Sequence, residues 1–175
     1  MRIATVLASG FEDSEFKLPY DEFRKAGHEV VVIGKKKGEK LKGKLGKEMI
    51  KADLAVDDAK PDDFDALFIP GGHSPDDLRA DDRFVQFVKG FEGKPILAIC
   101  HGPQLLLTAG MLRGRRVTAW RTVQGDLRFA GAVVEDEDVI VDANLVTSRQ
   151  PSDLPAFIRT SLELLRQAPE FRPTA

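Results

Sequence analysis

The chain has 175 residues, with 26 basic and 28 acidic side chains and a formal net charge of −2. Its length is that of one domain, and its 42% hydrophobic and 31% charged content is that of a globular protein. The near-neutral charge argues against a dedicated nucleic-acid-binding site, and no apolar run approaches the roughly 18 residues that cross a membrane. We therefore expect a single domain over residues 1–175, with a core of about 1–167 and a tail of 168–175.

Apolar runs and helical periodicity predict an alternation of strands and helices. Continuous apolar runs are typical of parallel strands that are covered by helices on both faces. Strands are predicted, in chain order, at residues 3–8, 29–33, 66–69, 95–99, 133–134, 139–141 and 145–148. Helices are predicted at residues 14–26, 82–91, 102–109 and from residue 152 onward. The fold class is therefore an α/β sandwich with a mostly parallel sheet.

Opposite charges are segregated in the segment between the second and third of these strands. Residues 35–51 hold eight lysines, and residues 53–65 hold six aspartates. A basic patch for nucleic acid is one interpretation, but no aromatic side chains alternate with the lysines as base stacking would require. We expect a solvated hairpin near the sheet edge, outside the functional site.

Cys100 is the only cysteine and the sharpest chemical signal in the sequence. It follows an apolar strand and precedes His-Gly-Pro, with small neighbours that suit the tight turn of a nucleophile elbow. The positive end of the following helix is expected to lower the thiol pKa and so favour the reactive thiolate. A buried structural cysteine is the alternative. A single cysteine cannot form an internal disulfide, which favours the reducing cytoplasm.

Other candidate residues follow strands at the same sheet edge, where open α/β sheets bind ligands. Glu12 follows the first strand and is either a helix N-terminal acid or a partner of the thiol. Gly71 and Gly72 can present backbone N–H groups and, with the N–H of His101, form an oxyanion hole. The His101 ring is a candidate general acid or base. Asp13 and Glu15 are interpreted as capping or surface acids.

The three histidines and one cysteine show no metal-ligand spacing, and no dinucleotide or phosphate-binding glycine motif is present. We therefore expect no metal and no cofactor.

Six segments in order resemble the DJ-1/ThiJ/PfpI superfamily, and especially its PfpI-type branch of intracellular protease-like and general stress proteins. They are FEDSE at 11–15, AGHEV at 26–30, FDALFIPGG at 64–72, AICHGPQLL at 98–106, AGMLRGR at 109–115 and VTSRQPSDLPAF at 146–157. The resemblance implies a flavodoxin-like three-layer sandwich, similar to class I glutamine amidotransferases, with the cysteine on a nucleophile elbow.

The resemblance also implies roles for particular residues. It places the nucleophile at Cys100, its histidine at His101, the glutamate that contacts the sulfur at Glu12, and oxyanion donors at Gly72 and His101. It further implies that an acid from a neighbouring subunit, here Asp76, approaches the histidine. The implied assembly is a homodimer or a hexamer built from dimers.

A shared fold does not by itself choose a function. An activated thiol beside an acid and an oxyanion hole suits attack on a carbonyl or aminocarbinol carbon. The first hypothesis is therefore a cytoplasmic stress-response cysteine hydrolase that acts on glyoxal or methylglyoxal adducts, as a deglycase or glyoxalase, or on peptides. The alternative is a non-enzymatic stress protein, redox-sensing through an oxidisable Cys100 or chaperone-like.

Overall fold

The computed structural model describes residues 1–168, and their centre is a seven-stranded sheet. The strand order is β10-β11-β7-β6-β1-β2-β5, and all neighbours are parallel except the antiparallel pair β10 and β11. The strands are β1 (Arg2–Val6), β2 (Glu29–Gly34), β5 (Leu54–Ala55), β6 (Ala66–Ile69), β7 (Ile96–Ile99), β10 (Val139–Asp142) and β11 (Leu145–Ser148).

Two small sheets lie beside the main one. The first is an antiparallel hairpin of β3 (Lys40–Lys42) and β4 (Met49–Lys51), which confirms the hairpin predicted for the lysine-rich segment. The second pairs β8 (Arg116–Val117) with β9 (Val133–Val134) in parallel.

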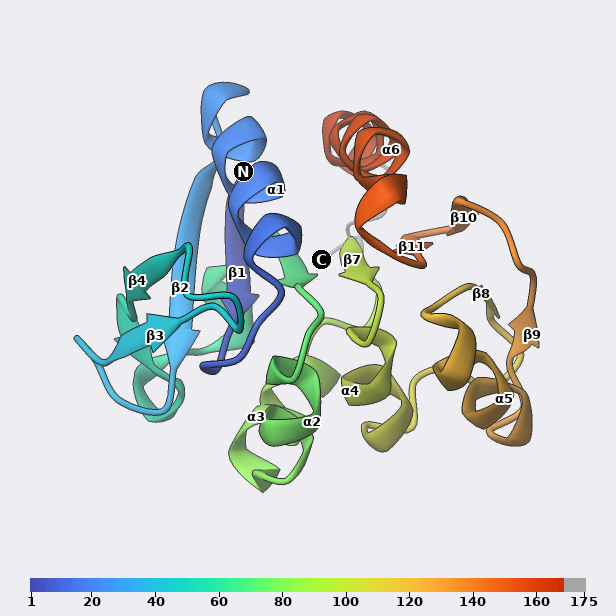
Figure 1. The fold of residues 1–175 in the computed structure, drawn as a ribbon, viewed down its shortest axis with the longest axis horizontal. Coiled ribbons are helices and arrows are strands. Elements are labelled where there is room, and N and C mark those ends of the chain that lie inside the picture. The colour runs from blue at the N-terminus through green and yellow to red at the C-terminus, as the bar shows by residue number, and fades with distance from the viewer. Residues whose placement is uncertain (169–175) are drawn as a thin grey trace.

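Helices cover both faces of the sheet (Figure 1). One face carries α1 (Asp13–Lys25) and α6 (Leu154–Gln167), which contact each other. The other face carries α2 (Ser74–Arg79), α3 (Asp82–Lys89), α4 (Pro103–Thr108) and α5 (Arg121–Phe129). Short 3-10 turns occupy Val56–Asp58, Pro61–Asp63 and Pro151–Asp153. None of the helices in residues 1–168 is long and apolar enough to span a membrane.

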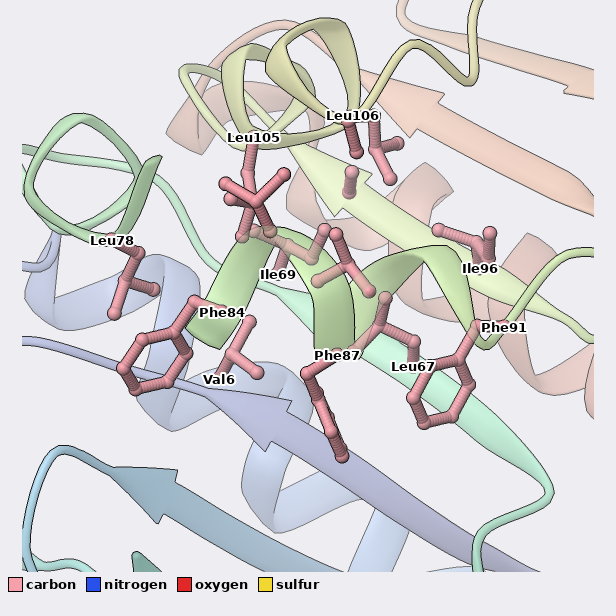
Figure 2. Packing of buried hydrophobic residues seen from close by; sticks show 14 of the residues in the cluster. Val6, Leu67, Ile69, Leu78, Phe84, Phe87, Phe91, Ile96, Leu105 and Leu106 are labelled. Carbon is pink, nitrogen blue, oxygen red and sulfur yellow. The ribbon is translucent and has the colours of Figure 1, made fainter. Parts of the chain in front are cut away.

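Successive side chains of a β-strand point to opposite faces of the sheet, so buried strands predict two apolar cores, one on each face. Leu67 and Ile69 of β6 point toward α2, α3 and α4, where Phe84, Phe87 and Leu105 meet them (Figure 2). On the opposite face, α1 and α6 contribute aromatic side chains, including Phe23 and Phe157, which pack against Phe68 of β6. The predicted mostly parallel α/β sandwich is confirmed.

Differences from the sequence-based prediction are confined to short elements. The sequence did not indicate α2, α5 or β5, each of which is nine residues or shorter. Short elements carry little periodicity, and Gly125 within α5 weakens the helical signal further. Of the predicted tail at 168–175, only Ala168 lies within the described residues, where it ends α6.

Candidate active site

Cys100 occupies a strained turn between β7 and α4. Its φ angle is +62°, a left-handed conformation that non-glycine residues rarely adopt. The Cys100 N–H donates to the Ser148 carbonyl at 2.9 Å, and the Cys100 carbonyl accepts from the Trp120 N–H at 2.9 Å. A Cβ at Gly102 would lie 2.6 Å from the Ile69 carbonyl oxygen, so the turn requires glycine there. The predicted nucleophile elbow is present and fixed from both sides.

The carboxyl group beside the thiol belongs to Glu15 of α1. Glu15 is fully buried, and its carboxyl interacts with the Cys100 side chain and with the Gly71 backbone. Neither carboxyl oxygen completes a hydrogen bond of ordinary geometry within the described residues. Burial, followed by the negative charge of Glu12, raises the pKa of Glu15 to about 8. At neutral pH the group is therefore mostly a carboxylic acid that can donate a proton toward the sulfur.

Glu12 was expected to contact the sulfur, and the structure gives that contact to Glu15 instead. The Glu12 carboxylate pairs with the Lys44 ammonium at 2.7 Å, and its other oxygen accepts from the Ser14 hydroxyl at 3.4 Å. The physical reason is position, because Glu12 immediately precedes α1 whereas Glu15 lies on the helix face that is turned into the core. The interpretation of Asp13 and Glu15 as capping or surface acids is likewise wrong, since both are buried and, within residues 1–168, no side chain caps the start of α1.

His101 turns its ring toward the thiol although it is adjacent in sequence. The ring Nδ1 lies 3.3 Å from the Cys100 sulfur, and the ring stacks on Trp120 with 6.3 Å between centroids. Burial lowers the pKa of His101, and the nearby charges of Lys44 and His73 lower it further. A neutral imidazole at hydrogen-bonding distance can accept the thiol proton.

The diglycine loop after β6 faces both acidic groups. The backbone N–H groups of His101 and Gly72 face the sulfur and lower the pKa of the thiol, whereas the Gly71 N–H lies against the Glu15 carboxyl. A Cβ at Gly71 would collide with Glu15 and lie 2.8 Å from the Cys100 Cβ. Gly72 has a φ of +78°, which favours glycine. The two N–H groups at the sulfur suit the oxyanion of an adduct on that atom.

The pKa of the Cys100 thiol is raised, whereas the sequence predicted that the following helix would lower it. Burial raises it, the negative charge of Glu15 raises it further, and the His101 and Gly72 N–H groups lower it only in part. The side chain is 7% exposed, and the loss of hydration outweighs the positive end of the six-residue helix α4. Cys100 and Glu15 therefore act as a coupled pair, whose first proton leaves near the pKa of Glu15.

Asp76 lies on α2, where its exposed carboxylate pairs with Arg79 at 2.8 Å. Its charge raises the pKa of His101 within the same chain. The approach of Asp76 from a second subunit stays a prediction. Within residues 1–168, no group of three His, Cys, Asp or Glu side chains is placed to hold a metal ion.

Sequence reasoning missed two members of this cluster, Glu15 and Lys44. Glu15 precedes Pro19 and Phe23 by four and eight residues, which places it on the buried stripe of α1, so helical spacing could have identified it. Lys44 comes from the β3–β4 hairpin, and only the tertiary fold brings it to Glu12. The expectation that the lysine-rich segment lies outside the site is therefore wrong for this residue.

The sequence was compared with protein families and with individual known proteins. The model of the DJ-1/PfpI family matches residues 1–164. The chain is 53% identical to protein/nucleic acid deglycase 2 of Escherichia coli strain K12 over 167 residues, which cover 94% of this chain and 97% of that protein. It is also 53% identical to general stress protein 18 of Bacillus subtilis strain 168 over 169 residues, covering 95% and 98%.

A solved structure shows the same fold. DJ-1 of Schizosaccharomyces pombe superposes with a TM-score of 0.82 at 26% identity, covering 95% of this chain and 91% of that one.

Proposed function

The chain belongs to the DJ-1/PfpI family, and we propose that it is a cytoplasmic, cysteine-dependent hydrolase that removes glyoxal or methylglyoxal adducts from amino groups. The observation that carries the proposal is the place of the Cys100 thiol, beside the buried carboxyl of Glu15, whose pKa is raised to about 8, and facing the N–H groups of Gly72 and His101. The similarity to a deglycase and to a general stress protein supports the same substrate class and a role in stress.

The first step joins the sulfur to the aminocarbinol carbon of the adduct. His101 accepts the thiol proton, the sulfur–carbon bond forms, and the carbon–nitrogen bond breaks. The amine leaves with a proton supplied by His101 or Glu15. The product on Cys100 is a thiohemiacetal, and the Gly72 and His101 N–H groups stabilise negative charge on its oxygen.

The second step needs only proton transfers and water. The proton on the thiohemiacetal carbon moves to the neighbouring carbonyl carbon, and the hydroxyl proton moves to that carbonyl's oxygen, which converts the thiohemiacetal to a thioester. Glu15 and His101 can carry these protons. Water then cleaves the thioester and restores the thiol. The sum is adduct plus water giving amine plus lactate, or glycolate from a glyoxal adduct, with no net oxidation or reduction.

Release of lactate from methylglyoxal-modified amino acids tests the proposal. Wild type is expected to release it faster than the adduct dissociates spontaneously, and Cys100→Ser is expected to release it at the buffer rate. Equal release by both proteins would overturn the proposal. Lactate release by wild type that equals, but never exceeds, the rate of spontaneous adduct dissociation would identify free methylglyoxal as the substrate. Peptide cleavage with adducts untouched would change the substrate class to peptides.

A redox-sensing role finds less support in this geometry. A sensor thiol is typically exposed and has a lowered pKa. Cys100 is 7% exposed, and burial raises its pKa. The homodimer or hexamer remains part of the proposal, with Asp76 of a second subunit approaching His101.

A further inference from the structure

The turn of the β3–β4 hairpin is fastened to the start of α1 by one buried carboxylate. Asp13 accepts backbone N–H groups from Leu45, Lys47 and Glu48, each at 2.9 Å. Burial alone would raise the pKa of Asp13, but these donors lower it, so the group stays ionised. A Cβ at Gly43 would collide with the same carboxylate. Asp13, the first residue of α1, therefore fixes the position of the hairpin turn.

The same hairpin is tied to the loops of the active site through its backbone. The Lys44 N–H donates to the Phe11 carbonyl at 2.8 Å, and the Gly10 N–H donates to the Lys42 carbonyl at 2.8 Å. Phe11 in turn pairs with Gly72, whose N–H faces the Cys100 sulfur. The position of Lys44 is thus linked to that of the loop that holds the thiol.

The Lys44 side chain pairs with Glu12 and carries a positive charge close to the active site. Its ammonium lies 2.7 Å from the Glu12 carboxylate, and its side chain is 36% exposed. The hydrogen bond with Glu12 raises the pKa of Lys44, and the charges of Glu15 and Cys100 raise it further. In the reverse direction, Lys44 lowers the pKa of Glu15. The ammonium is therefore a permanent positive charge near both members of the pair.

We propose that Lys44, presented by the hairpin that Asp13 anchors, is a positioning residue that favours the singly charged state of the Cys100–Glu15 pair. In that state one proton has left the pair for solvent, and the sulfur shares the remaining negative charge with the carboxyl. Lys44 acts through this charge and makes no bond to substrate. The other charged or titratable groups around the pair are Glu12, which opposes the anionic state, and His101, on which the charges of His73 and Asp76 act.

The inference rests on the proposed function only for its effect on turnover, because the thiol can be measured directly. Iodoacetamide is uncharged, and the chain has one cysteine, so the intact mass of the protein reports alkylation of Cys100 alone. Rates measured between about pH 5.5 and 9.5 give the midpoint at which the thiol becomes reactive. Lys44→Met keeps the length of the side chain and removes its charge.

Lys44→Met is expected to move the midpoint to higher pH and to slow alkylation roughly threefold at pH 7, as befits a partly exposed charge. Lys44→Arg is expected to restore the wild-type profile. Lys51→Met, on exposed β4 of the same hairpin, is the matched control and is expected to match wild type. The difference between wild type and Lys44→Met is expected to shrink at high salt.

An unchanged midpoint in Lys44→Met, or an equal shift in Lys51→Met, would overturn the inference. Failure of Lys44→Arg to restore the profile would also overturn it, because the charge would then not be the cause. The proposed function fails separately, through absence of lactate release, since alkylation requires no substrate.

Discussion

Replacing Glu15 by glutamine is expected to stabilise the protein increasingly as the pH rises. Glu15 is fully buried, and its pKa is raised from 4.5 to about 8. The unfolded chain therefore releases a proton between pH 4.5 and 8 that the folded protein retains, so stability falls as the pH rises through this window. At about 1.4 kcal/mol per pH unit, the loss attributable to Glu15 reaches about 3 kcal/mol at pH 7 and about 5 kcal/mol above pH 8.

Urea unfolding at a series of pH values between about 4.5 and 9 measures this effect, with wild type and Glu15→Gln at one protein concentration. A buried glutamine amide adds an offset that does not depend on pH, so the diagnostic quantity is the change in the difference between the two proteins. Glu22→Gln, at a partly exposed position of the same helix, is the control. A difference that stays flat from pH 5 to pH 8.5 would refute the buried, protonated state of Glu15.

Three further substitutions test the contacts around the site and the hairpin beside it. Gly71→Ala places a Cβ against Glu15 and Cys100, so urea unfolding should show a loss of about 2 kcal/mol, whereas Gly125→Ala, with no atom within 4 Å, should gain up to about 1 kcal/mol. An alanine tolerated at both positions would contradict the contact. Asp13→Asn should cost about 2 kcal/mol and speed hydrogen exchange of the three turn amides that it binds. Unchanged exchange there would show that the turn is held by other contacts.

Much of the sheet could be predicted because its strands are buried on both faces. Such strands appear as short continuous apolar runs, and the chain places Cys100 directly after one of them. The loop positions of Gly72 and His101 followed from the rule that ligands bind beyond the carboxyl ends of parallel strands. Local sequence was sufficient here because each of these residues is positioned by the strand that precedes it.

The electrostatics of the site could not be predicted in the same way. Glu12 was predicted because it lies in the loop after the first strand. The acid that reaches the sulfur is Glu15, which projects from the buried face of α1. Lys44 depends on Asp13, which binds turn amides that lie 32 to 35 residues away in the chain. The thiol pKa depends on how much of Cys100 is buried, and a sequence motif does not reveal the depth of a side chain.

The rate of lactate release by Glu15→Gln beside Glu12→Gln shows directly which of the two acids serves the thiol, with methylglyoxal-modified amino acids as substrate. Glu15→Gln is expected to lose at least about 100-fold, because the proton-transferring group at the sulfur is gone. Glu12→Gln should lose less than about tenfold, because its carboxylate pairs with Lys44 and does not contact the sulfur. Full activity in Glu15→Gln, with loss of activity in Glu12→Gln, would contradict the assignment of Glu15 as the acid at the sulfur.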